Sequence, residues 1–329
     1  MKAYYDHAGV TLYHGDALAC LAQLPSESVN CCVTSPPYWG LRDYGCEGQI
    51  GLEPTPELFI ARLVEVRRTL RPDGLLFVNM GDSYAGGKTG RGDADRPNGP
   101  LHAMGVRGGN SAKLTAITIG AKARLVPEGL KPKDLVGVPW MLAFALRADG
   151  WYLRSDIIWA KPAPMPESVT DRCTKSHEYI FMLAKSEKYF YDADAIAEPA
   201  ICVGDTRHLR TDKTALLARP NKGSRFRTGN PQAATRNKRD VWTVNSDPLP
   251  DAHFSTFPLA LILPCVLAGC PAGGIVLDPF SGAGTTALVA KEQGRRAIGI
   301  ELNAEYLEIA ARRLRQDVFD FGPSEVRDK

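Results

Sequence analysis

The sequence contains no long hydrophobic run and no recognisable export signal. No stretch of the 329 residues approaches about eighteen consecutive apolar residues, the length that a membrane-spanning helix requires. The first residues, MKAYYDHAGVTLYHGDAL, lack the charged start and the apolar segment of a secretory signal. We therefore expect a soluble, cytoplasmic protein that has no contact with a membrane.

Closely spaced cysteine pairs are also absent. The eight cysteines include no C-x-x-C motif, and Cys265 and Cys270 with a distant histidine would make an unusual zinc site. In a chain of this length without an export signal, cysteines are more often reduced thiols in the core than disulfides. We expect no metal.

The charge is nearly balanced over the whole chain but not along it. The formal net charge is +3, yet residues 86–133 carry +6, residues 205–240 carry +7 and the rest of the chain carries −10. Both basic segments are rich in Gly, Asn, Arg and Lys and lack hydrophobic periodicity, which indicates loops or insertions outside the core. A charge run is usually a solvated linker, but two basic insertions on an acidic body favour contacts with nucleic-acid phosphates.

Outside these segments, short apolar runs alternate with stretches of helical periodicity, and 44% apolar residues are ample for a core. The pattern predicts strands over 28–35, 74–83, 151–161, 177–186, 275–278 and 295–302, and helices over 56–70, 139–150, 257–274, 285–294 and 303–316. The helix over 257–274 is expected to be interrupted near Pro264, and Asn303 and Gly294 to cap helix ends. This order predicts an α/β fold with a mostly parallel sheet, whose ligand lies at the carboxyl ends of the strands.

A glycine turn follows the strand over 275–278, in the sequence DPFSGAGTT. Gly282 and Gly284 let the backbone approach a ligand at a helix start, and Glu301 at the next strand end can accept both hydroxyls of a ribose. An adenosyl ligand suits this layout. A phosphate-binding P-loop does not, because Thr285 and Thr286 stand where its lysine would be.

DPFSGAGTT together with GIELN and TSPPYW resembles the DNA amino-methyltransferases that use S-adenosylmethionine, over most of the chain outside the basic insertions. The motif order is similar to the permuted β class. The resemblance implies a Rossmann-like methyltransferase fold, with helices on both faces of a twisted sheet and basic insertions that form a target-recognition region. It divides one domain into a catalytic half over 1–85, a basic insertion over 86–133, a continuation of the catalytic half over 134–193, a target-recognition region over 194–250 and a cofactor-binding half over 251–329.

The resemblance also implies residue roles. Asp16 in HGDAL would contact the adenine of the cofactor, and Glu301 its ribose. The other residues expected to hold the cofactor are Asp278, Phe280, Gly282, Gly284 and Thr285, with His253, Phe254, Phe257 and Pro258 on the methionine side.

The corner Ser35, Pro36, Pro37 and Tyr38 would be catalytic. The amino nitrogen of cytosine or adenine is a poor nucleophile because its lone pair is delocalised into the ring. The Ser35 hydroxyl oxygen and the Pro36 carbonyl can accept its two hydrogens and localise the lone pair, and two prolines keep these acceptors rigid. Tyr38 would stack on a base flipped out of the duplex, and Trp39 would support the wall of the site on its DNA side.

Double-stranded DNA is the expected partner. The arginines expected to bind it are Arg207, Arg210, Arg225, Arg227, Arg236 and Arg239, as phosphate contacts or as guanine readers. A serine at the start of the corner favours N4 of cytosine as the target in the resembled family, while N6 of adenine stays open. A homodimer and a companion restriction endonuclease also stay open.

Other functions fit the sequence less well. A nicotinamide oxidoreductase would share the fold but leave TSPPYW unexplained, and an RNA or protein amide methyltransferase would not need two basic insertions. Methylation of cytosine carbon 5 needs a Pro-Cys nucleophile, and Cys265 after Pro264 lies in an apolar helix and not on a loop. A non-catalytic descendant would have lost Ser35, Asp278 or Glu301.

Overall fold

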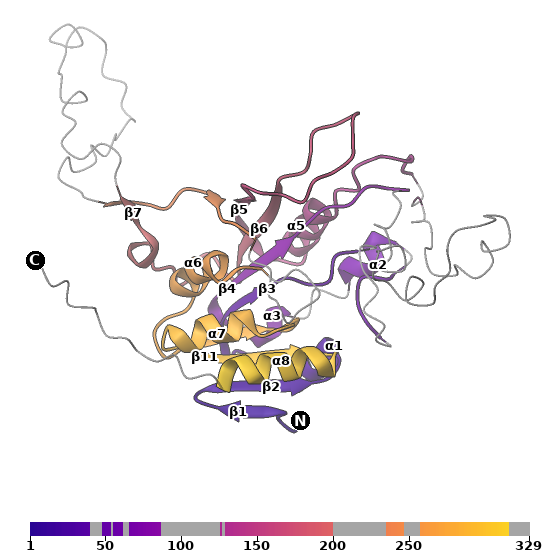
Figure 1. Cartoon of the computed structure of the whole chain (residues 1–329). Helices are drawn as coiled ribbons and strands as arrows, with labels where there is room; N and C mark the ends of the chain where they lie inside the picture. Colours follow the sequence, from indigo (N-terminus) through magenta and orange to yellow (C-terminus); the bar gives the residue numbers. More distant parts are fainter. Residues whose placement is uncertain are drawn as a thin grey trace, which may run out of the picture.

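The computed structural model describes residues 1–39, 48–53, 55–61, 66–86, 126, 129–199, 235–246 and 257–315. Their core is a nine-stranded sheet with the strand order β1-β2-β11-β10-β3-β4-β6-β5-β9 (Figure 1). The strands of this sheet are β1 Tyr5–His7, β2 Val10–His14, β3 Val29–Thr34, β4 Leu70–Met80, β5 Tyr152–Ala160, β6 His177–Ala184, β9 Val241–Thr243, β10 Ile275–Asp278 and β11 Arg296–Glu301. The five strands from β2 to β4 in this order are mutually parallel, β6 is antiparallel to both of its neighbours, and β1 is antiparallel to β2. The predicted α/β fold with a mostly parallel sheet is confirmed.

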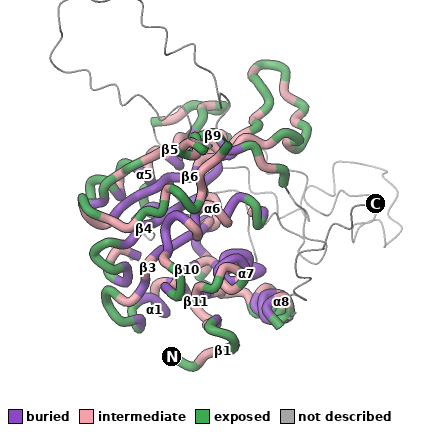
Figure 2. The backbone as a smooth tube through the Cα atoms, turned by 90° about the vertical axis from the view of Figure 1, so that its left-hand side faces the viewer, coloured by how far each residue is buried: buried purple, intermediate pink, exposed green. Residues whose placement is uncertain are grey.

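Helices cover both faces of the sheet. One face carries α6 Leu259–Gly269, α7 Thr285–Glu292 and α8 Ala304–Arg315, and the other carries α1 Ala17–Leu21, α2 Pro56–Ala61, α3 Val66–Thr69 and α5 Val138–Ala148. Within β3, Cys31 and Val33 pack into the core on the side of α6, α7 and α8, while Val29 and Cys32 pack into the core on the side of α1, α2, α3 and α5. A strand that is apolar on both faces is expected in a parallel sheet covered by helices on both sides. Figure 2 shows the buried strands running through the middle of the molecule.

Several predicted elements differ in their bounds. The predicted helix over 56–70 is observed as the two short helices α2 and α3, with 62–65 outside the described residues. The predicted interruption near Pro264 is wrong, because α6 continues through that residue. Its neighbours Leu261, Ile262, Cys265 and Val266 are at most 1% exposed, and this burial outweighs the one backbone hydrogen bond that a proline removes. The predicted caps are present: Asn303 Oδ1 accepts the amide of Glu305 at 2.8 Å, and Gly294 has a φ of 69° after α7.

The basic segments lie mostly outside the described residues. From the second one, β8 Thr235–Arg236 pairs with β7 Glu198–Pro199 in a separate two-stranded ribbon. β9, which directly follows this basic segment, joins the edge of the main sheet beside β5. The described parts of 1–85, 134–193 and 251–329 all contribute strands to the main sheet. In the described part of the chain, no helix has the length and apolar character needed to cross a membrane.

The sheet has a switch point between β3 and β10. The chain leaves β3 toward the helices on one face and leaves β10 toward α7 on the other, although these two strands are hydrogen-bonded neighbours. Connections that diverge from adjacent parallel strands leave a crevice at their carboxyl ends, where ligands of such sheets bind.

Candidate active site

A cavity of about 300 Å³ opens along the carboxyl ends of the central strands. It extends from the glycine turn after β10 to the proline corner after β3, so residues more than 240 positions apart share one space. The predicted site residues that line it are Asp16, Ser35, Pro36, Pro37, Tyr38, Phe257, Phe280, Gly282, Thr285 and Glu301. Asp278 and Gly284 lie behind its wall.

Asp278 joins the two halves of the site. It is 1% exposed, and its carboxylate accepts the hydroxyls of Thr34 and Thr286, each at 2.7 Å, and the Phe280 amide at 3.1 Å. Burial raises the pKa of this carboxyl to about 6, although the three hydrogen bonds act in the opposite direction. Asp278 therefore fixes the turn after β10 to the end of β3.

Glu301 shapes the glycine turn. Its carboxylate accepts the amide of Gly282 at 2.7 Å and the amide of Asn303 at 2.8 Å, and desolvation raises its pKa. Gly282 has a φ of 50°, and a Cβ built there would have no neighbour within 4 Å, so its backbone faces open space. At Gly284, with a φ of 76°, a Cβ would lie 2.9 Å from the Cβ of Ala310, so glycine is required where α7 begins against α8.

These features fit an adenosyl ligand. The carboxylate of Glu301 lies at the cavity wall beside exposed turn backbone, as a ribose requires. The hydroxyl of Ser281, which also lines the cavity, is buried without a hydrogen-bond partner in the structure. An unpartnered buried hydroxyl at a cavity wall is a group that a polar ligand can satisfy.

The cofactor wall is the side of the cavity formed by the glycine turn, Glu301 and Asp16. Asp16 in this wall and Arg313 behind it make hydrogen bonds within the chain. Asp16 is the N-cap of α1, and its Oδ1 accepts the amide of Ala19 at 2.9 Å. Arg313, which sequence reasoning missed, donates from Nη1 to the carbonyl of Ala283 at 2.5 Å and to the hydroxyl of Thr285 at 3.2 Å. A guanidinium that binds a loop carbonyl from the last turn of α8 holds the glycine turn from behind.

The proline corner places Ser35 and Tyr38 beside two polar residues of the neighbouring strands. Ser35 Oγ donates to Asn79 Oδ1 at 3.3 Å. The hydroxyl oxygen of Tyr38 lies 2.5 Å from Glu178 Oε2 and 3.1 Å from Asn79 Oδ1. The ring of Tyr38 packs against Gly81, where an added Cβ would lie 2.6 Å from Cε2. The corner is therefore attached to β4 and β6 as well as to β3.

Glu178 also binds Lys161, which lies at the end of β5. Lys161 Nζ donates to Glu178 Oε1, and the same ammonium lies 4.1 Å from the ring centroid of Trp159. All three residues line the cavity, together with Asn79. The sequence predicted strands over 151–161 and 177–186 but assigned no role to these side chains.

The structure places Trp39 in the core, away from the cavity lining. It is 8% exposed, packs in the cluster that contains α1, α2 and α5, and donates from Nε1 to the carbonyl of Glu53 at 2.9 Å. This position suits the predicted support of the wall, and little of the side chain is exposed for the predicted contact with DNA.

Two of the predicted DNA-binding arginines are described. Nε of Arg236 and Nε of Arg239 bind Oε1 of Glu198 at 3.1 and 2.7 Å, at the base of the β7–β8 ribbon. Arg239 remains 62% exposed. The other predicted residues outside the described ranges are His253, Phe254, Arg207, Arg210, Arg225 and Arg227.

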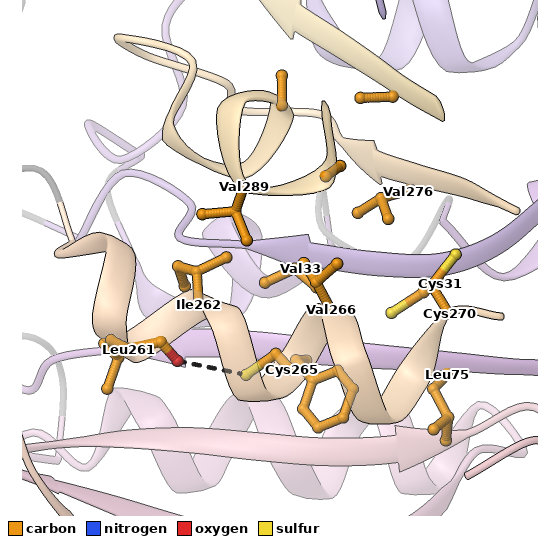
Figure 3. Packing of buried hydrophobic residues seen from close by; sticks show 14 of the residues in the cluster. Cys31, Val33, Leu75, Leu261, Ile262, Cys265, Val266, Cys270, Val276 and Val289 are labelled. Atoms are coloured by element: carbon orange, nitrogen blue, oxygen red, sulfur yellow. Dashed lines mark hydrogen bonds between the residues drawn. The ribbon is translucent and has the colours of Figure 1, made fainter. Parts of the chain in front are cut away.

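Cys265 lies in the core and not at the cavity. It is fully buried in α6 among Leu261, Val266 and Val33, and its thiol lies 3.7 Å from the carbonyl of Leu261 (Figure 3). Burial raises the pKa of this thiol far above its ordinary value, which suppresses the thiolate. The prediction that Cys265 is a core residue is confirmed.

Comparison with known proteins assigns a family to this site. Residues 29–312 match the N6_N4_Mtase family, described as DNA methylase. The chain belongs to this family. It is therefore an S-adenosylmethionine-dependent DNA methyltransferase, as the resemblance of its motifs implied.

Relatives cover nearly the whole chain. It is 49% identical over 310 residues to Type II methyltransferase M.Cfr9I of Citrobacter freundii, covering 93% of this chain and 88% of that protein. It is 47% identical over 305 residues to M.SmaI of Serratia marcescens, covering 91% and 89%. A protein described as a DNA modification methylase from Thermus thermophilus, solved with S-adenosyl-L-methionine, is 26% identical, with a TM-score of 0.52 over 93% and 96% of the two chains. The cytosine-N4-specific PvuII DNA methyltransferase shares the fold, with 18% identity and a TM-score of 0.61 over 96% and 90%.

Proposed function

We propose that this DNA methyltransferase transfers a methyl group to the exocyclic amino nitrogen of a base flipped out of double-stranded DNA, and that the base is cytosine, methylated at N4. The observation that carries the proposal is the single cavity that joins the Ser35 corner to the Gly282 and Glu301 wall. Such a cavity holds an amino group and a methyl donor within reach of one another, which converts a two-molecule reaction into a local one.

In this mechanism the cofactor wall binds and orients. The carboxylate of Glu301 would accept hydrogen bonds from the ribose hydroxyls. Asp16 would contact the adenine through the carboxylate oxygen that does not cap α1. Phe257 and Phe280 would enclose the methionine side. When bound, S-adenosylmethionine would supply the methyl group from its sulfonium sulfur, and the rest of the cofactor would leave as a neutral thioether. The buried Asp278 holds the wall at the carboxyl end of β3, close to the corner where the methyl group is accepted.

The corner activates the amino group. Ser35 donates its own hydrogen to Asn79 Oδ1, which leaves the lone pairs of Oγ for one amino hydrogen of the base. The Pro36 carbonyl accepts a hydrogen bond from the other amino hydrogen, and the nitrogen lone pair is then free to attack the methyl group. The methylated nitrogen returns to a neutral amine by releasing one of its protons to solvent. Pro37 keeps the acceptors rigid, Tyr38 stacks on the flipped ring, and Trp39 supports this wall from the core.

The choice of cytosine rests on Ser35. In the resembled family, a serine at the start of this corner is commoner among enzymes for N4 of cytosine than for N6 of adenine. Recognition of the target sequence falls to residues 194–250, and Arg239 is the described arginine with the most exposed guanidinium there. The Type II relatives support a restriction endonuclease of the same target as a companion.

The test is mass spectrometry of nucleosides from DNA of mixed sequence incubated with the purified enzyme and S-adenosylmethionine. We expect N4-methylcytosine, with no methylated base when the methyl donor is left out. N6-methyladenine in its place would overturn the choice of base. The absence of any methylated amino group would overturn the whole proposal.

A further inference from the structure

The hairpin loop 161–176 begins in the lining of the cavity. It joins β5 to β6, and β5 runs parallel to β4 because both are antiparallel to β6. The loop therefore leaves the sheet at the same edge as the active site (Figure 1). It begins at Lys161 in the cavity lining and is closed by a hydrogen bond from the Lys161 amide to the Ser176 carbonyl at 2.8 Å.

This loop is braced along its length although it is exposed. Glu167 accepts Arg172 Nη1 at 2.7 Å and the Lys175 amide at 3.2 Å, which ties one side of the loop to the other. The guanidinium of Arg172 lies 4.1 Å from the ring centroid of Tyr84, and Lys175 Nζ donates to the carbonyl of Asp82 at 3.0 Å. These contacts fix the loop to the segment that follows β4.

The braced loop carries an apolar side chain into water. Met165 is 86% exposed, and the next most exposed large hydrophobic side chain of the described residues is Val241 at 57%. Pro162, Pro164 and Pro166 occupy alternate positions around it, and each proline restricts the backbone. Because polar contacts hold the loop in place, the side chain of Met165 stays exposed and is available to a partner.

The proposed reaction creates a place for such a side chain. A base that enters the cavity leaves a gap in the duplex and loses its stacking and pairing. Proteins that distort DNA commonly insert Met, Leu, Ile, Phe or Pro between base steps to replace lost stacking. Lys161 at the foot of this loop lines the cavity, so a duplex that delivers a base to Ser35 comes near the loop.

We propose that Met165 is a wedge that enters the duplex where the flipped base was stacked, and that loop 161–176 is a DNA-binding surface. The inference rests on the proposed function. Met165 replaces stacking at the vacated position and stabilises the flipped state, while Lys161 at the foot of the loop remains on the cavity side.

The experiment compares Met165→Ala with the wild type on two duplexes that carry the target sequence of the wild-type enzyme. One duplex is fully paired, and the other has an abasic site opposite the target base, so that flipping costs less. On the paired duplex we expect kcat/KM to fall about tenfold, because part of the unstacking cost is no longer offset. On the abasic duplex the two proteins should agree within about twofold, and Met165→Leu should retain most of the activity on both.

A matched control lies at the other end of β5, the strand that leads into loop 161–176. Tyr152 begins β5 at the opposite edge of the sheet and is 45% exposed, and Tyr152→Ala should leave both rates unchanged. Equal losses by Met165→Ala on both duplexes, or no loss on the paired duplex, would overturn the wedge. These outcomes leave the methylation of DNA by the wild type intact, so they are distinct from a failure of the proposed function. The melting temperature of each variant confirms that the fold is kept.

Discussion

The cofactor wall and the proline corner differ in how firmly their functional groups are held. At the wall, the buried carboxylate of Asp278 and the partly buried carboxylate of Glu301 accept five hydrogen bonds of 2.7 to 3.1 Å from the chain itself. At the corner, Tyr38 is also held, by contacts of 2.5 and 3.1 Å with Glu178 and Asn79, but the Ser35 hydroxyl has one hydrogen bond of 3.3 Å among the described residues. The two carboxylates of the wall are therefore fixed before any ligand binds, whereas the Ser35 hydroxyl is left for a substrate. Binding and chemistry should respond to different substitutions.

The largest difference between the effect on kcat and the effect on cofactor binding is expected for Ser35→Ala. It removes an acceptor for the amino group, so kcat should fall by about two to three orders of magnitude. The dissociation constant for S-adenosylmethionine, measured by calorimetry, should stay within about twofold because the wall is untouched. Ser28→Ala, which removes a surface hydroxyl bonded to the Pro25 carbonyl at the amino end of β3, is the control. Equal damage to kcat and to cofactor binding would contradict the role of Ser35.

Glu301→Gln should have the opposite signature. The amide keeps the size of the side chain but places an NH₂ group near the amides of Gly282 and Asn303 and loses the charge-assisted bonds to the ribose. We expect the affinity for S-adenosylmethionine to fall about tenfold to a hundredfold. The kcat of the saturated enzyme should change less than in Ser35→Ala. The exposed Glu187, after β6 at the opposite edge of the sheet, provides the matched Glu187→Gln control; a loss confined to kcat would refute the assignment.

Asp278 lies between the two regions, and the titration of its carboxyl should make the free energy of unfolding depend on pH. Its pKa is raised from 3.8 to about 6 in the folded protein, first by desolvation. The folded protein then binds more protons than the unfolded chain, so stability declines as the pH rises from about 4 to about 6. The decline due to this group is about 3 kcal/mol. Urea unfolding at several pH values should show a flatter profile for Asp278→Asn, whatever its overall stability.

The control for that series is Asp73→Asn. Asp73 is about half exposed at the opposite edge of the sheet, with 52% of its side chain accessible. Its variant should keep the pH profile of the wild type. If Asp278→Asn keeps it as well, the carboxyl of Asp278 titrates no differently in the folded and unfolded chain, and the picture of a desolvated link between wall and corner is wrong.

The smallest effect on activity is expected for Cys265→Ala. A thiol inside α6 has no route to the base, so kcat should stay within about twofold while the free energy of unfolding falls by about 1 kcal/mol. Cys31→Ala, in the same buried cluster, should behave alike. Complete loss of turnover by Cys265→Ala alone would point to covalent attack on the ring and reverse the assignment of the corner as the reactive region.

Much of the wall and of the fold was predictable because the signals are local. Apolar runs gave β3, β10 and β11, and the turn DPFSGAGTT with the acidic strand end placed Gly282 and Glu301 together. These contacts span about twenty positions of chain. The strands β1 and β2 were not predicted, since three to five residues carry too little periodicity.

The polar surroundings of the corner were not predictable in the same way. Asn79 and Glu178 meet 99 positions apart because β4 and β6 pair in one register, which places Asn79 opposite Ile180. Nothing in either segment specifies that register. The burial of Trp39 was not predictable for a similar reason: its indole packs in the same cluster as residues of α2 and bonds to the Glu53 carbonyl, and the sequence pattern places neither against the corner.

The β7–β8 ribbon has a consequence for how specificity can change. Glu198 and Arg236 are paired residues, so the two ends of the segment between them lie side by side. If residues 194–250 read the target sequence, as proposed, these two positions are junctions at which the segment could be exchanged between methyltransferases. A chimera joined there would show whether the target sequence moves with the segment.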